Sequence, residues 1–208
     1  MTQYHISEKK RMAREETIIK PYHQLYNRRA LPSNKQYWTL SALCSDAKGN
    51  YLQGCELHHM IKSGLISPEQ FHGVDNDPKI VNKNKHLQSS NWYCGDFFNV
   101  LSQAKDFHPA IINYDSTSCP ELASITLADI LALCTNQNIS DVMVVGNICV
   151  KIRYRSYTIQ DVADHLCTTD LFRHVVNRGN WNCLPKQYVY SGSGKNVTKM
   201  CSVVFYKH

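Results

Sequence analysis

The feature that most constrains the fold is an alternation of short apolar segments with helical ones, which repeats and then stops. Apolar segments of strand length occur at 36–44, 71–75, 91–94, 110–115 and 141–150. Segments with helical features separate them, and the clearest is 121–134, where leucine and isoleucine recur at helical spacing. Strands joined through helices run parallel, because a parallel connection needs a long crossover. The alternation therefore predicts an α/β sheet with helices on both faces.

The C-terminal part breaks this rhythm. After a helix predicted at 158–176, two strand-like segments at 186–190 and 200–206 are separated by a turn rich in glycine and serine. Such a pair predicts an antiparallel hairpin. The turn contains Gly194-Lys195 but lacks the spacing of a phosphate-binding loop and opens no helix. The predicted fold is thus a doubly wound, mostly parallel seven-stranded Rossmann-like sheet that ends in an antiparallel hairpin.

The first 34 residues differ in composition from the rest. We expect a basic N-terminal helical segment at 1–34, with a helix that starts at Ser7 and is interrupted at Pro21, followed by an α/β domain at 35–208. The basic side chains of the N-terminal segment can contact a phosphate backbone. Alternatively, the segment is a solvated helix that packs on the domain through Ile18 and Ile19, and this is the commoner outcome for such a run of charges. The whole chain carries 23 basic and 17 acidic residues, a net charge of +6 that permits DNA or RNA as a partner without requiring either. The basic residues of the segment are Lys9, Lys10, Arg11, Arg14, Lys20, Arg28 and Arg29.

Cysteine usage predicts the compartment. The nine cysteines include no C-x-x-C pair, and several lie in apolar runs where a reduced thiol behaves as a small hydrophobe. Reduced thiols are typical of a cytoplasmic protein. No apolar run approaches the ~20 residues of a membrane span, and the start of the chain does not resemble a signal peptide.

Acidic residues follow the first four predicted strands. Ligands of open parallel sheets bind at the carboxyl ends of strands, where loops and helix N-termini converge. A carboxylate there can bind an ammonium group, the two hydroxyls of a ribose, or the amino group of an adenine. It can equally cap the next helix, and for a single residue the two roles are about equally common. The four residues are Asp46, Asp75, Asp96 and Asp115.

The order of these motifs resembles a known family. With Gly73-Val74-Asp75 after the second strand, Gly95-Asp96 after the third and the hairpin at the end, residues 36–206 are similar to class I S-adenosylmethionine-dependent methyltransferases. The resemblance implies S-adenosylmethionine as cofactor, with its ribose on Asp75 and its adenine framed by Asp96 and Phe97. It also implies that Asp46 and the loop from Gly49 to Gly54 pass the methionine moiety. The methyl group would be delivered near Asp115 and Ser116, with Asp115 as the orienting group or base.

Two departures from the family pattern keep a second function open. The first loop has only Gly49 and Gly54, five residues apart, in place of closely spaced glycines. The residues after the fourth strand are Asp-Ser-Thr-Ser, without the prolines and the aromatic residue of enzymes that methylate base amino groups. The alternative is a non-catalytic module with the same fold that binds nucleic acid or protein.

A metal-dependent nuclease is a further alternative. Glu56, His58 and His59, with Asn76 and His86 downstream, resemble the residues of His-Asn-His nucleases, which hold one divalent metal. The ββα pattern of that family is absent here. Adjacent histidines on a helix also point ~100° apart, so they serve one site poorly. We therefore expect no metal site at these residues.

Overall fold

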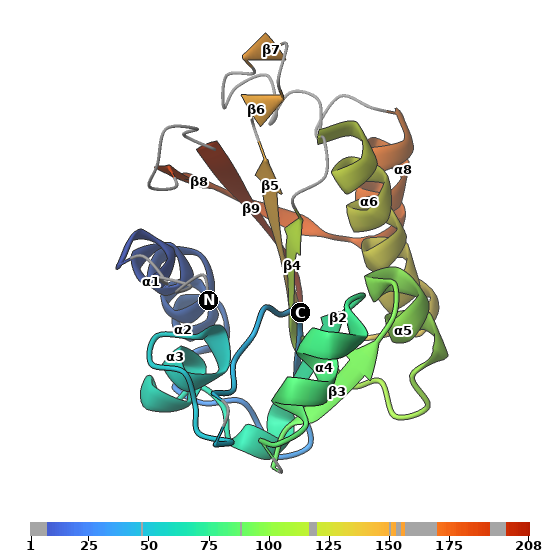
Figure 1. Cartoon of the computed structure of the whole chain (residues 1–208). Helices are drawn as coiled ribbons and strands as arrows, with labels where there is room; N and C mark the ends of the chain where they lie inside the picture. Colours follow the sequence, from blue (N-terminus) through green and yellow to red (C-terminus); the bar gives the residue numbers. More distant parts are fainter. Residues whose placement is uncertain are drawn as a thin grey trace.

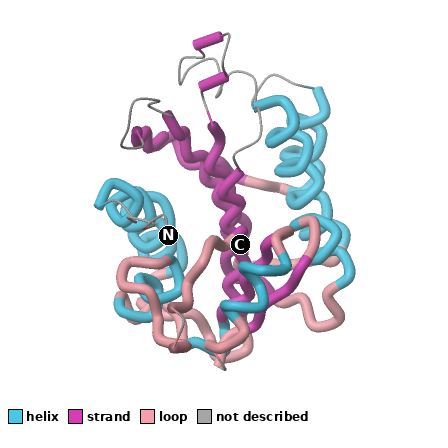
Figure 2. Tube along the Cα trace, in the orientation of Figure 1, coloured by secondary structure: helices cyan, strands magenta, loops and turns pink. Residues whose placement is uncertain are grey.

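The computed structural model describes residues 8–46, 48–87, 89–116, 120–149, 151–152, 155–156, 170–191 and 199–208. Within these ranges a central sheet lies between two groups of helices (Figures 1 and 2). No described helix is long and apolar enough to cross a bilayer.

The sheet has seven strands in the order β3-β2-β1-β4-β5-β9-β8. The first five in this order are parallel, whereas β9 is antiparallel to both of its neighbours. The predicted fold, a mostly parallel seven-stranded sheet ending in an antiparallel hairpin, is therefore confirmed. A separate two-residue ladder joins β6 to β7, and the sequence did not predict it. The strands are β1 Gln36–Leu40, β2 Phe71–Asp75, β3 Asn91–Cys94, β4 Pro109–Ser116, β5 Val142–Cys149, β6 Lys151–Ile152, β7 Arg155–Ser156, β8 Asn182–Ser191 and β9 Lys199–Lys207.

The helices divide between the two faces of the sheet. α5, α6 and α8 cover one face, and α1 to α4 with η1 cover the other (Figure 1). The N-terminal half of the helix predicted at 158–176, and nearly all of the turn at 191–196, lie outside the described residues. The helices are α1 Glu8–Arg14, η1 Glu15–Ile19, α2 Lys20–Tyr26, α3 Glu56–Lys62, η2 Pro68–Gln70, α4 Pro78–Asn84, α5 Phe97–Gln103, α6 Pro120–Asn136 and α8 Asp170–Gly179.

The prediction that Pro21 interrupts the first helix was wrong. α1, η1 and α2 follow one another without a gap from Glu8 to Tyr26. η1 is a π-helical turn in which the Lys20 N–H bonds to the Glu15 carbonyl, five residues back. Pro21, which has no N–H to donate, follows just after this wider turn, at the start of α2. Ile18 and Ile19 are buried in the same cluster as Tyr37 of β1.

The first predicted strand was too long. β1 ends at Leu40, and the chain leaves the sheet after the Ser41 N–H has bonded to the Val74 carbonyl, at 3.0 Å. The next backbone groups bond away from the sheet, because the Cys44 and Ser45 N–H groups donate to Oδ1 of Asn84 at 2.8 and 3.1 Å. The apolar run at 36–44 thus continues beyond the strand into a loop, in which Ser41 and Cys44 are buried and Ala42 is exposed.

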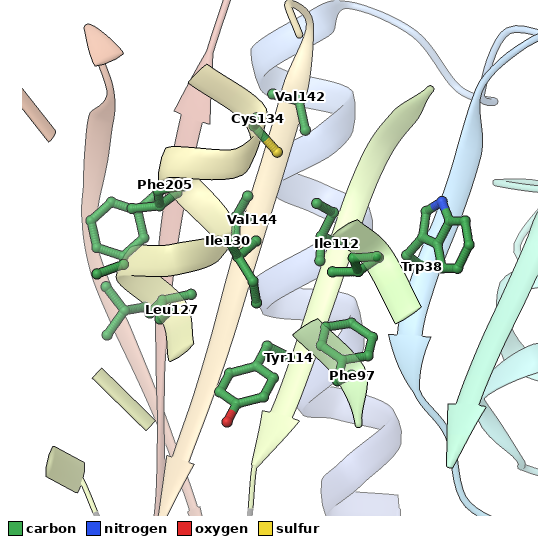
Figure 3. Packing of buried hydrophobic residues seen from close by; sticks show 14 of the residues in the cluster. Trp38, Phe97, Ile112, Tyr114, Leu127, Ile130, Cys134, Val142, Val144 and Phe205 are labelled. Carbon is green, nitrogen blue, oxygen red and sulfur yellow. The ribbon is translucent and has the colours of Figure 1, made fainter. Parts of the chain in front are cut away.

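The face covered by α5, α6 and α8 is an apolar core. Figure 3 shows Ile112 and Val144 of the sheet packed against Leu127 and Ile130 of α6. These four side chains are fully buried. Tyr114 and Ile148, near the carboxyl ends of β4 and β5, belong to the same core.

Candidate functional site

The ends of β2 and β3 lie side by side at the carboxyl edge of the sheet. Asp75 is opposite Cys94, and the Gly95 N–H donates to the Asp75 carbonyl at 3.1 Å. The Asp75 side chain accepts a hydrogen bond at 2.8 Å from the Asp77 N–H and another from the Asn76 backbone. Desolvation nonetheless raises the pKa of Asp75 above its usual value. A further hydrogen-bond donor would therefore stabilise the charged form of this half-buried carboxylate.

Asp96 and Phe97 have different positions at this edge. Asp96 is exposed and caps α5 by accepting a 3.0 Å hydrogen bond from the Asn99 N–H. Phe97 is only 3% exposed, and its ring stacks on Tyr114 at a centroid distance of 5.7 Å within the apolar core. The Phe97 ring thus belongs to the apolar core, and its contact with an adenine stays a prediction. The packing of α5 on β4 sets the direction of the Phe97 ring.

The Asp46 side chain forms its hydrogen bonds within the loop after β1. The Asp46 carboxylate accepts hydrogen bonds from the backbone N–H of Asn50 and of Lys48, at 2.9 and 2.8 Å, and from the Asn50 amide at 3.1 Å. These bonds, led by the one from the Asn50 backbone, lower the pKa of Asp46. Gly49 and Gly54 have φ angles of 78° and 82°, in the region that favours glycine. The loop is a closed turn whose carboxylate already has its donors.

This loop lies away from Asp75. An ideal Cβ built on Gly49 would be 3.5 Å from His86, just beyond the C-terminal end of α4. α4 begins at Pro78, close to Asp75, and a helix of its seven residues is about 10 Å long. The structure thus brings Asp75 and Asp96 together at the edge, but it places Asp46 and Gly49 near the far end of α4.

Asp115 is the penultimate residue of β4, which lies two strands away from β2 and Asp75, a separation of about 10 Å between the strands. Its carboxylate lies 3.9 Å from Nζ of Lys10 in α1. Desolvation raises the pKa of Asp115, although Lys10 opposes the shift. Ser116, the other predicted catalytic residue, is buried next to it. A carboxyl group at a strand end whose pKa is raised is a candidate for proton transfer.

A buried carboxylate, which the sequence analysis did not select for this edge, lies below Asp115. Glu56, at the start of α3, is 4% exposed and accepts hydrogen bonds from the Tyr37 hydroxyl at 2.6 Å and the Asn113 amide at 2.8 Å. Nη2 of Arg14 lies 3.4 Å from its second oxygen. Burial and the neighbouring Glu56 charge raise the pKa of Tyr37 well above its usual value. Glu56 is therefore a buried carboxylate with Arg14, Tyr37 and Asn113 as partners.

Hydrogen bonds extend from Glu56 across three further strands. The Asn147 amide donates to Oδ1 of Asn113 at 2.8 Å, and the Ser202 hydroxyl donates to Oδ1 of Asn147. A cavity of about 10 Å³ adjoins this chain beneath α1, which is room for one water molecule. The only sequence signal was an asparagine within each of two strand segments. We call the set the polar cluster: Arg14, Tyr37, Glu56, Asn113, Asn147 and Ser202.

The residues of the nuclease alternative do not form a metal site in the described part of the chain. Glu56 is held by Arg14, as above. Nδ1 of His58 accepts the Gly54 N–H at 3.4 Å, whereas Nε2 of His59 lies 3.8 Å from Glu15. The two histidines thus face different partners, and among the described residues no three possible ligands of this kind converge. His86 lies beside Gly49, beyond the end of α4.

A parallel five-stranded series extended by a reversed β9 between β5 and β8 is the fold of class I S-adenosylmethionine-dependent methyltransferases. The chain is similar in structure to precorrin-6y C5,15-methyltransferase from Geobacter metallireducens GS-15, with 9% sequence identity, a TM-score of 0.51 and complete coverage of both chains. It is also similar to LepI in complex with SAM, with 10% identity and a TM-score of 0.51, over 93% of this chain and 48% of LepI. No protein-family model and no curated protein sequence matches the chain. At these identities the likeness establishes the fold.

Proposed function

We propose that the protein is a methyltransferase that binds S-adenosylmethionine at the carboxyl edge of β2, β3 and β4. The observation that carries the proposal is the half-buried Asp75 carboxylate beside Gly95 and Asp96, in a fold shared with LepI, which was solved in complex with SAM. Asp46, by contrast, has its donors within its own loop. We therefore assign the main cofactor contact to Asp75.

Each residue at the edge has a distinct role in this proposal. Asp75 accepts hydrogen bonds from the ribose hydroxyls, which offset its desolvation. Asp96 accepts from the adenine amino group while its other contact caps α5. The bound cofactor supplies an electrophilic methyl group. Asp115, whose pKa burial raises, orients the acceptor or takes up its proton, and Ser116 adjoins it.

The polar cluster favours a second candidate, the non-catalytic binding module. Lys10 and Arg14 of α1 pair with Asp115 and Glu56, so α1 lies over the end of β4. Methyl transfer near Asp115 requires an acceptor to approach this position. A protein that retains α1 there in all states binds ligands without transferring a methyl group. Cofactor binding with no turnover toward any acceptor would support this candidate.

The acceptor class rests on weaker grounds. A nucleic-acid acceptor fits the net charge of +6, but several N-terminal cations have acidic neighbours. Arg11 pairs with Glu8, Lys20 with Glu16, and Arg28 with Asp141. These pairs reduce the positive field of the segment. We keep DNA or RNA as a proposed partner, and the cytoplasm as the proposed location, in line with free thiols at all six of the cysteines whose side chains are described.

Calorimetry with S-adenosylmethionine and S-adenosylhomocysteine tests the cofactor assignment. We expect the wild-type protein to bind both, and Asp75→Ala to bind at least ~10-fold more weakly, since a hydrogen bond to a charged group contributes about 1.5–3 kcal/mol. Asp96→Ser retains a capping side chain but loses the carboxylate, so it isolates the adenine contact. Asp77→Ser is the matched control, because Asp77 caps α4 through the Lys79 N–H.

Two results would overturn the assignment. One is no binding of either ligand by the wild-type protein. The other is an unchanged affinity in Asp75→Ala while the circular dichroism spectrum remains that of the wild type. A separate titration of DNA and RNA binding against salt tests the partner, because phosphate contacts weaken steeply as the salt concentration rises.

A further inference from the structure

The amine of Lys10 in α1 lies beside the carboxylate at which the proposed function places the methyl acceptor. Nζ of Lys10 is 3.9 Å from Oδ2 of Asp115. The Lys10 side chain is 47% exposed and that of Asp115 is 21% exposed, so the pair lies at the surface of the carboxyl edge. A general base must lie close to the proton that it removes, and this distance commonly shortens when the ligand binds. Lys10 and Asp115 are thus placed as an acceptor nitrogen and its base.

Contacts of Arg14, one turn further along α1, hold Lys10 in this position. Nη2 of Arg14 lies 3.4 Å from Oε2 of Glu56, and its Nη1 donates to the Gly54 carbonyl at 3.4 Å. Lys10 and Arg14 both line the cavity of about 10 Å³ beneath α1, together with Asp115. The face of α1 that carries Lys10 is therefore turned toward the end of β4.

Among the described cations, Lys10 and Arg14 are the two whose charges act on Asp115. A guanidinium stays protonated in proteins, whereas an amine can lose its proton and act as a nucleophile. Lys20 provides the contrast, because its side chain is similarly exposed, at 50%, but pairs with Glu16 within the N-terminal helices. The hydrogen bond to Glu16 raises the pKa of Lys20. Lys10 is therefore the amine that the described structure presents at the candidate transfer position.

We propose that Lys10 is an intramolecular methyl acceptor, which the protein methylates from S-adenosylmethionine bound at the carboxyl edge. This role of Lys10 rests on the proposed function, which supplies the cofactor. Lys10 first passes one proton to Asp115, and its Nζ then bonds to the methyl carbon as the bond from this carbon to sulfur breaks. S-adenosylhomocysteine leaves with the electron pair of the broken bond. The methylated nitrogen keeps its positive charge, and Asp115 releases the proton to water.

Methylation of Lys10 gives α1 a role that differs from its role in the non-catalytic candidate. In both cases α1 lies over the end of β4 and occupies the position that an external acceptor would need. In the non-catalytic candidate Lys10 stays unmodified, whereas here it takes up the methyl group itself. Because the product remains part of the chain, each molecule modifies its own Lys10 without turnover. An external acceptor gains access only when α1 moves away.

Mass spectrometry of the full-length protein tests the proposal. Cleavage after glutamate yields the peptide 9–15, which contains Lys10, and the peptide 17–56, which contains Lys20. After incubation with S-adenosylmethionine we expect the peptide 9–15 to be heavier by about 14 Da per methyl group, with fragment ions that place the change on Lys10 and not on Lys9. Lys10→Arg keeps the positive charge but should abolish this mass change. Lys20→Arg is the matched control and should retain it.

The outcomes distinguish the failure of this proposal from the failure of the proposed function. An unmodified peptide 9–15 in protein that binds S-adenosylmethionine overturns the proposal and leaves the cofactor assignment standing. So does an equal extent of methylation in Asp75→Ala at a subsaturating cofactor concentration, because such a reaction does not use the site. A methylated fraction per unit time that rises with protein concentration contradicts an intramolecular acceptor. No binding of S-adenosylmethionine overturns the proposed function, and the role of Lys10 with it.

Ligand affinities give a second readout, which needs no methyl transfer. The sulfonium of S-adenosylmethionine is positively charged, whereas the sulfur of S-adenosylhomocysteine is neutral, so a cation beside the sulfur weakens the binding of S-adenosylmethionine alone. In calorimetry we expect the affinity for S-adenosylmethionine relative to S-adenosylhomocysteine to be about fivefold or more higher in Lys10→Met than in Lys10→Arg. Lys20→Met and Lys20→Arg should have equal ratios. Equal ratios in the two Lys10 variants would place this side chain away from the sulfonium and contradict the proposal.

Discussion

The two faces of the sheet are built from the same strands but differ in chemistry. On the face of α5, α6 and α8, β4 contributes Ile112 and Tyr114 to an apolar core (Figure 3). On the face of α1 and α3, the intervening Asn113 and Asp115 belong to hydrogen bonds and ion pairs. Successive residues of a strand point to opposite faces, so one strand serves both purposes. Both faces are therefore packed by hydrophobic side chains, and the face of α1 and α3 carries the candidate chemistry in addition.

The comparison also assigns a role to the N-terminal segment. α1 supplies Arg14 to the buried Glu56, and Lys10 to Asp115. α1 thus supplies the positive charges that offset the repulsion between the Asp115 and Glu56 carboxylates. The basic segment is thus part of the face of α1 and α3, which is called the polar face below; the face of α5, α6 and α8 is called the apolar face. Five substitutions test this contrast between the faces.

The largest effect is expected on the polar face. Glu56→Leu leaves the Arg14 guanidinium buried without its counter-charge and removes the acceptor of Tyr37 and Asn113. We expect a loss of about 3–5 kcal/mol in the free energy of unfolding, measured with urea. The double variant Arg14→Met/Glu56→Leu should recover much of this loss, because it removes both charges. A double variant as unstable as Glu56→Leu contradicts the pairing.

On the apolar face we expect a substitution to lower the free energy of unfolding, with no charged partner whose removal restores it. Leu127→Ala removes a fully buried side chain of α6 that packs next to Gly146 of β5. The cavity should cost about 3 kcal/mol in the free energy of unfolding, with no dependence on pH between 5 and 8. Urea unfolding at both pH values checks this. A cost below about 1 kcal/mol would mean that this face is not tightly packed.

His72 allows a test through the pH dependence of the free energy of unfolding. It is stacked on Trp38 at 4.4 Å, and desolvation lowers its pKa to about 4. A depressed pKa contributes stability that is present above the unfolded pKa of about 6.5 and is lost as the pH falls toward 4. We expect the wild-type protein to lose about 2 kcal/mol more than His72→Phe between pH 7 and pH 5, in urea unfolding. Equal losses in the two proteins would show that His72 is not the titrating group.

A smaller effect is expected at the N-terminus of α5. Asp96→Ala removes the acceptor of the Asn99 N–H and should cost about 1 kcal/mol in the free energy of unfolding. Asp96→Ser should restore most of it, since serine also caps. Thermal unfolding of the two variants makes the comparison. If Ala and Ser are equally stable, capping does not account for the position of this residue.

The smallest effect is expected at an exposed pair. Arg28 lies 3.5 Å from Asp141, and both side chains are about as exposed as ordinary surface residues. Arg28→Ala should change the free energy of unfolding by no more than about 0.5 kcal/mol, with still less change at high salt. A loss comparable to that of Glu56→Leu would remove the distinction between buried and surface charge.

The sequence predicted the strands well where their ends carry clear signals. β2 and β3 match the predicted ranges 71–75 and 91–94, because each ends at polar or glycine residues that begin a turn. The end of β1 was missed because the apolar residues continue into a loop held by Asn84. The π-helical turn before Pro21 was also missed, since its backbone bonds leave no compositional trace.

The site was harder to predict than the fold. Acidic residues at strand ends could be found from order alone, and Asp75 and Asp96 do lie at neighbouring strand ends. The direction of the Phe97 ring depends on packing against Tyr114, a contact between segments far apart in the chain. The Arg14–Glu56 pair likewise joins residues 42 positions apart, and no local pattern marks such a pair.

A crystal structure of the protein with S-adenosylhomocysteine tests the central claim most directly. We predict density for the ligand at the carboxyl edge, with the ribose hydroxyls within hydrogen-bonding distance of Asp75 and the adenine amino group near Asp96. Ligand density elsewhere, such as in the cleft of about 700 Å³ at the opposite edge beside Lys35 and Asn91, would contradict the account.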